Sequence, residues 1–149
     1  MPKRHHFISQ LAHVELLSPK LEESVKFFRE VLGMEESGRI GQSVYMRAWG
    51  EFFHHSLKIT EAKTNGVGHI GWRAESDEDL LDAVQYIENM GCGKGWIDGD
   101  LGHGRAYQYY SPDGHLEEIF WEVELAEIPA HLKSKWRSRP QKNPSRGAS

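Results

Sequence analysis

The sequence lacks the features of a secreted, membrane-spanning or nucleic-acid-binding protein. Its one cysteine, Cys92, excludes an intrachain disulfide and argues against a cysteine-based metal site. No apolar run approaches the roughly 18 residues that a membrane-spanning helix needs. The formal net charge of -4 and the pI of about 6.1 argue against nucleic acid or anionic membrane as a partner. These absences predict a soluble, cytoplasmic protein.

Histidine, by contrast, is plentiful. The chain has nine histidines in 149 residues, including the pairs His5-His6 and His54-His55. At 38% hydrophobic, a chain of this length can bury one core but is too short for two ordinary domains. A single domain is therefore expected to carry the candidate functional residues.

Residues 8–60 predict a βαβββ module. An apolar, alternating strand at Gln10 to Leu17 contains His13. Ser18 and Pro19 then predict an N-cap and a first helical residue, with the helix running to about Leu32 before Gly33. The helical apolar stripe consists of Leu21, Val25, Phe28 and Leu32. Strands are expected in the segment that ends near Gly41, at 43–49 and at 53–60.

The same order of features returns in residues 67–124. His69 follows His13 by 56 residues, and Ser76 with Asp79 predicts a second helix N-terminus. The second helical stripe consists of Leu80, Val84 and Ile87, and further strands are expected at 93–100, 106–110 and 116–122. The sequence therefore predicts an α+β fold in which two tandem βαβββ modules form one curled mixed sheet.

The chain changes character after residue 124. A short helix is expected at 126–136, and the basic, Pro- and Ser-containing stretch at 137–149 is typical of a linker or tail. We therefore expect one domain over residues 1–124 and a short helix with a basic linker or tail over 125–149.

The stretch S-P-D-G-H-L-E-E-I-F-W-E predicts a turn followed by a strand with Glu118 on the same face as Leu116 and Phe120. A carboxylate between two large apolar side chains is costly to bury unless a cation or several hydrogen-bond donors meet it. Glu118 is therefore a candidate for chemistry. The alternative is that this face lies at an edge and Glu118 is solvated.

Pairing of the two modules about a pseudo-twofold axis would bring His13, His69 and Glu118 together. Two imidazoles and one carboxylate form the facial-triad ligand set, which suits Fe(II) and also Mn(II) and leaves open coordination positions. Each histidine taken alone is more often a structural residue of a strand. The order His, His, Glu across the repeat is the specific signal.

These motifs resemble the vicinal oxygen chelate superfamily and, within it, the extradiol (catechol 2,3-) dioxygenases. The resemblance covers about residues 8 to 124 and rests on A-H-V-E-L-L-S-P, V-K-F-F-R-E-V-L-G-M-E-E, Q-S-V-Y-M-R-A-W-G, G-V-G-H-I-G-W and the stretch around Glu118. It implies the glyoxalase-like fold and metal ligands at His13, His69 and Glu118. It also implies that His55, or its neighbour His54, is the acid-base histidine.

The chain departs from the family pattern in several places. Gln108 stands where the catalytic domain of the family has a tyrosine, and His103 is only a loose candidate for a further histidine of that domain. Two-domain extradiol enzymes also carry an N-terminal copy that has lost the metal, and this chain resembles that copy. Lys58 lies near the place of a fourth, carboxylate ligand in glyoxalase I, which disfavours that activity. An outward, solvated Lys58 is the commoner arrangement.

Two functions follow from the resemblance. The first is ring cleavage of vicinal diphenols with O2, by an Fe(II) enzyme or its N-terminal domain. The second is a metal-free module that binds a small aromatic ligand or packs on a catalytic domain. In either case a homo-oligomer or a C-terminal catalytic domain is the expected partner. Candidates for an aromatic slot, although packing in the core is commoner, are Trp49, Phe52, Phe53, Tyr107 and Tyr109.

Overall fold

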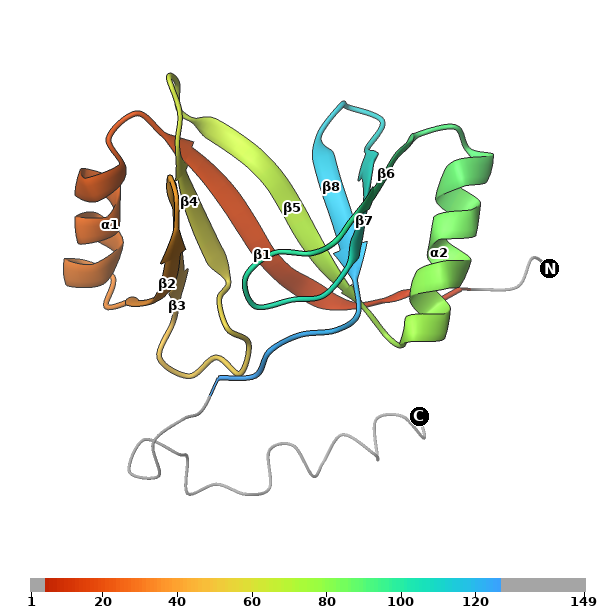
Figure 1. Cartoon of the computed structure of the whole chain (residues 1–149), viewed down its shortest axis with the longest axis horizontal. Helices are drawn as coiled ribbons and strands as arrows, with labels where there is room; N and C mark the ends of the chain where they lie inside the picture. Colours follow the sequence, from red (N-terminus) through yellow and green to blue (C-terminus); the bar gives the residue numbers. More distant parts are fainter. Residues whose placement is uncertain (1–4, 127–149) are drawn as a thin grey trace.

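A computed structural model describes residues 5–126 of the chain as one open, eight-stranded mixed sheet with two helices (Figure 1). The strand order across the sheet is β2-β3-β4-β1-β5-β8-β7-β6. In chain order the elements are β1 (Ile8–Ser18), α1 (Leu21–Glu30), β2 (Glu35–Ile40), β3 (Ser43–Arg47), β4 (Leu57–Glu61), β5 (Gly66–Ala74), α2 (Asp77–Asn89), β6 (Gly93–Ile97), β7 (Ala106–Tyr110) and β8 (Leu116–Phe120).

The sheet is built from two copies of the same βαβββ order, as the sequence predicts. The first strands of the two modules, β1 and β5, pair antiparallel at the centre. Within each module the last strand pairs parallel with the first, so that β4 lies beside β1 and β8 beside β5. The predicted α+β class and the tandem modules are confirmed. The helices lie at the two ends of the molecule, each covering its own module (Figure 1).

Helix α1 begins later than the sequence predicts. Its N-cap is Lys20, which makes no capping hydrogen bond through its side chain. Ser18 remains the last residue of β1, where its Oγ accepts a hydrogen bond from the backbone N–H of Lys20 at 3.1 Å. The prediction of Ser18 as N-cap is therefore wrong, because the β1 ladder extends through this residue. Leu32, predicted on the buried stripe, is exposed beyond the helix end.

Helix α2 begins as predicted. The Oγ of Ser76 accepts a hydrogen bond from the backbone N–H of Asp79 at 3.0 Å, which satisfies one of the free N–H groups of the first turn. The glycines that follow the two helices, Gly33 and Gly91, have φ values of 76° and 75°. Both adopt the left-handed conformation that ends a helix, which the sequence predicts for Gly33.

We expect Ser76→Ala to lower the free energy of unfolding by about 1 kcal/mol, because the N–H of Asp79 loses its partner. The matched control is Lys20→Ala at the same position of α1, where no capping bond exists to be lost. Urea unfolding followed by circular dichroism measures both variants. Equal destabilisation by the two substitutions would contradict the capping role.

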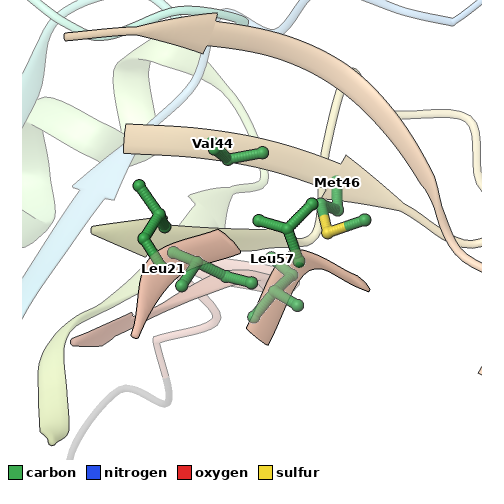
Figure 2. Packing of buried hydrophobic residues seen from close by; sticks show 6 residues of the cluster. Leu21, Val44, Met46 and Leu57 are labelled. Atoms are coloured by element: carbon green, nitrogen blue, oxygen red, sulfur yellow. The ribbon is translucent and has the colours of Figure 1, made fainter. Parts of the chain in front are cut away.

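The apolar core lies between the sheet and the helices. Under α1 the cluster, shown in Figure 2, consists of Leu21, Val25, Val44, Met46, Leu57 and Ile59. Under α2 it consists of Ala74, Leu80, Ala83, Val84, Tyr107 and Ile119. Because side chains alternate along a strand, the opposite face of the same strands carries His13, Glu15 and Glu118. That inner face holds the candidate site, beside a smaller buried apolar cluster of Ala12, Ala106 and Phe120.

Four predicted strands are shorter in the structure, of which β3 and β8 end two residues early, at Arg47 and Phe120. Strand β4 begins at Leu57, so residues 53–56 form a loop in which Phe53 makes an isolated bridge with Leu125. Strand β6 ends at Ile97, and the loop from 98 to 105 reaches across the sheet toward the first module (Figure 1). Among residues 5–126 no helix is both long and apolar enough to span a membrane. The helix and tail predicted beyond residue 126 lie outside the described residues.

Candidate metal centre

The register of the central strands places His13, Gly71 and Glu118 in one row. His13 on β1 is the partner of Gly71 on β5, which in turn is the partner of Glu118 on β8. His69 lies two residues before Gly71 and therefore faces the same side of the sheet. An added Cβ on Gly71 would lie 2.5 Å from Nε2 of His13, so only glycine leaves room for this ring above β5.

The three predicted ligand residues converge on one point. The Nε2 atoms of His13 and His69 are 2.8 Å apart. The carboxylate of Glu118 lies 3.2 Å from Nε2 of His69 and 3.9 Å from Nε2 of His13. All three residues are buried, and one ligand atom from each lies within 4.8 Å of the others.

His69 presents a free lone pair to this point. Its Nδ1 lies 3.0 Å from Oε1 of Glu15, and because an ionised carboxylate only accepts, Nδ1 carries the hydrogen. In the neutral ring Nε2 is then without hydrogen. Two facing nitrogens such as Nε2 of His69 and Nε2 of His13 need one hydrogen or one cation between them.

His103 is a further histidine at the site, with its side chain 2% exposed. Its Nδ1–H donates to the carbonyl of Gly104 at 2.7 Å, which leaves Nε2 of the neutral ring as an acceptor. That Nε2 lies 3.3 Å from Oε2 of Glu118, and the ring stacks on Phe120 at 4.2 Å between centroids. The sequence indicated His103 only loosely, because its place depends on how the loop after β6 folds back over the sheet.

This set of atoms fits a divalent cation. Glu118 is 1% exposed, and its Oε2 has no hydrogen-bond partner among the residues that the structure describes. A buried carboxylate that faces lone pairs without hydrogens is unfavourable unless a cation is shared between them. Two imidazoles and a carboxylate are the donor set that suits Fe(II) or Mn(II).

Burial keeps the nearby rings neutral. Desolvation, followed by the neighbouring histidines, lowers the pKa of His13 to about 2. Desolvation, followed by His54, lowers the pKa of His55 to about 3. The neutral imidazole is the form that binds a metal ion.

The predicted acid-base histidines lie in the loop before β4 rather than on a strand. His55 packs against His13 with ring centroids 5.1 Å apart, and its Nε2 has no hydrogen-bond partner among residues 5–126. His54 is one step further away, with its Nδ1 3.0 Å from Nδ1 of His55. The strand prediction fails here because Phe53 and His54 pair with the chain after β8, whereas the carbonyl of Ser56 already accepts from the N–H of Val14 on β1.

Lys58 points inward, contrary to the solvated arrangement that the sequence favoured. Its Nζ lies 2.5 Å from Oδ2 of Asp100 and 3.7 Å from Oε2 of Glu15. Desolvation alone would raise the pKa of Asp100, but hydrogen bonds from Lys58 and Tyr45 outweigh it and lower the value to about 2. The two carboxylates neutralise the ammonium, so its charge does not bar a cation from the site.

Of the five aromatic candidates Trp49 is exposed, and the other four separate into two groups. Tyr107 packs in the core under α2, so the prediction that it lines a slot is wrong, and Tyr109 also packs against this core and donates to Glu117. Gln108 instead faces the site and lies 3.4 Å from Oε1 of Glu118. A pocket of about 400 Å³ lies beside His13, and its lining includes Leu11, Phe52 and Phe53.

The chain is similar to proteins of a known superfamily. The profile of the Glyoxalase/Bleomycin resistance protein/Dioxygenase superfamily matches residues 10–119. A metapyrocatechase from Geobacillus stearothermophilus is 55% identical over 94% of this chain and 43% of its own length. A manganese-dependent 2,3-dihydroxybiphenyl 1,2-dioxygenase from Geobacillus genomosp. 3 is 35% identical over 88% of this chain and 42% of its own.

Solved structures show the same likeness. Homoprotocatechuate 2,3-dioxygenase from Brevibacterium fuscum, in its anaerobic complex with 3,4-dihydroxyphenylacetate, superposes with a TM-score of 0.78 at 29% identity. The match covers 87% of this chain and 42% of that one. The chain thus spans less than half the length of the relatives it matches.

Proposed function

The chain belongs to the Glyoxalase/Bleomycin resistance protein/Dioxygenase superfamily, and from this premise we propose that it is an extradiol ring-cleavage dioxygenase, or one domain of such an enzyme. It would act on vicinal diphenols with O2. The observation that carries the proposal is the buried convergence of His13, His69 and Glu118, with a carboxylate oxygen that lacks a hydrogen-bond partner. The relatives named above are dioxygenases of dihydroxylated aromatic compounds.

His13, His69 and Glu118 would hold Fe(II), with Mn(II) as the alternative that one relative's name suggests. Bound there, the metal supplies the Lewis acidity that lowers the pKa of a phenol and a path for electrons between diol and O2. Other side chains would orient the aromatic ring of the diol and transfer the proton of its hydroxyl group.

The pocket beside His13 is of a size that accepts one aromatic ring with its substituents. Phe52 and Phe53 would contact the faces or edges of that ring. The Nε2 of His55, buried and without a hydrogen-bond partner among residues 5–126, would take the proton of a diol hydroxyl and return it later. His54 would share that proton through the contact between the two Nδ1 atoms.

The proposal is tested by purifying the whole chain without oxygen and measuring its iron and manganese by mass spectrometry. We expect one equivalent of Fe(II) to bind, and the loaded protein to open catechol to a yellow semialdehyde with uptake of one O2 per ring. A panel with 2,3-dihydroxybiphenyl and 3,4-dihydroxyphenylacetate defines the substrate class. Absence of stoichiometric metal after Fe(II) addition would refute the proposal.

A metal-free module that binds a small aromatic molecule or packs on a catalytic domain is the second candidate. Gln108, at the place where the family's catalytic domain has a tyrosine, favours it. In that case the expected partner is a C-terminal catalytic domain, whereas a homo-oligomer suits an independent enzyme. Absence of Fe(II) binding, together with binding of a diol from the panel without ring opening, would support this second candidate, whereas stoichiometric Fe(II) would contradict it.

A further inference from the structure

Glu15 touches the candidate metal centre without being one of its three ligands. Its Oε1 accepts the Nδ1–H of His69 at 3.0 Å, on the side of the ring opposite to Nε2. A hydrogen bond of this kind fixes which nitrogen is free for a metal and how the ring is turned. On the basis of the proposed function, we infer that Glu15 is a positioning residue that holds His69 in its metal-binding tautomer and orientation.

The other oxygen of Glu15 is also held. Oε2 accepts a hydrogen bond from Oγ1 of Thr60 at 2.7 Å and lies 3.7 Å from Nζ of Lys58. Lys58 is itself fixed by Asp100 at 2.5 Å. Because both oxygens are engaged, the carboxylate cannot turn away from His69 without breaking a second contact. The chain Asp100, Lys58, Glu15, His69 therefore connects the loop after β6 to the metal centre.

The backbone of β5 leaves a gap for this carboxylate. An added Cβ on Gly68 would lie 2.7 Å from Cδ of Glu15, closer than real side chains allow. Gly68 immediately precedes His69, so the missing side chain lets Glu15 reach its partner across the strand. This gap is a second observation, independent of the hydrogen bond, that the structure accommodates the pair.

The internal repeat shows that this support is specific to one histidine. The offset of 56 residues places Gly71 at the position equivalent to Glu15, and a side chain at Gly71 would collide with His13. His13 is held instead by stacking between rings: its centroid lies 5.3 Å from His103 and 5.5 Å from Phe120, each at 19° between planes. The two histidines of the centre are thus supported by different means.

The test compares Glu15→Leu with Glu15→Gln for Fe(II) affinity, measured without oxygen by competition with a chelator. We expect Glu15→Leu to weaken binding by about 10- to 100-fold, as loss of a partner behind a metal ligand typically does. Glu15→Gln should lose less, because its amide oxygen can still accept from Nδ1. The control is Glu117→Leu, which removes a carboxylate that accepts from Trp72 and Tyr109 on the outer face. It should leave the affinity within about twofold.

The tautomer is observed directly in the metal-stripped protein. Nitrogen-15 NMR should show His69 with hydrogen on Nδ1 in the wild type and in Glu15→Gln, and a mixture of tautomers in Glu15→Leu. If the wild type binds Fe(II) and both its affinity and the His69 tautomer are unchanged in Glu15→Leu, the positioning role is wrong while the proposed function stands. If the wild type binds no Fe(II), both fail.

Discussion

Glu118→Gln is expected to abolish Fe(II) binding while making the metal-stripped protein more stable. Affinity should fall by more than about 100-fold, because a neutral amide replaces the only carboxylate among the three candidate ligands. Stability should rise by about 1 kcal/mol. The new amide can donate to Nε2 of His103, which lies 3.3 Å from Oε2 in the wild type and is an acceptor there. The retained oxygen can accept from Gln108.

These opposite signs separate a metal site from a structural carboxylate. Chelator competition measures the affinity, and urea unfolding in the presence of chelator measures the stability. The control is Glu117→Gln, the neighbouring residue on the other face, where the carboxylate accepts from Trp72 at 2.8 Å. If Glu118→Gln instead destabilised the stripped protein as much as this control does, the carboxylate would be serving the fold, and the metal centre would lose its main support.

Gly71→Ala is expected to destabilise the protein by about 2 kcal/mol and to remove Fe(II) binding as well. The added methyl group would lie 2.5 Å from Nε2 of His13 and 2.8 Å from its Nδ1. The φ of Gly71 is not positive, so steric overlap with this ring, rather than backbone strain, is the cause. The imidazole of His13 must therefore move away from Glu118, and the three candidate ligands no longer converge.

A double-mutant cycle tests this cause. In Gly71→Ala combined with His13→Ala, the methyl group occupies space that the ring has vacated. The double variant should therefore lose less free energy of unfolding than the two single variants lose together. Metal binding should stay absent in the double variant, because one ligand is gone. Simple additivity of the two destabilisations would show that Gly71 and His13 do not compete for the same space.

Much of the local structure could be predicted from neighbouring residues. The Ser76 cap and the glycines Gly33 and Gly91 are decided within one helical turn, so their signals lie side by side in the sequence. The local signal at Ser18 misled, because a serine before a helix can either cap the helix or continue the strand. Pairing of Ser18 with Glu61 on the distant strand β4 decided for the strand.

The candidate site was predicted only in part. The repeat offset indicated that His13 and His69 occupy equivalent strands, and the turn before Leu116 indicated the strand of Glu118. Glu15, by contrast, was not singled out, because its role depends on being opposite His69 in an antiparallel pair 54 residues apart. Alternation along a strand shows which side of the sheet a side chain faces. It does not show which residue of the neighbouring strand lies opposite.

The tandem βαβββ order, the presence of two helices and the three residues that converge could all be predicted, because each follows from periodicity, turn residues or internal repetition. The surroundings of those three residues depend on long-range packing. The loop after β6 brings His103 against Glu118, Lys58 turns inward to Asp100 and Glu15, and His55 leaves its predicted strand. Each of these contacts joins segments far apart in the chain, so their energies depend on strand register and on the curl of the sheet, which no local pattern encodes.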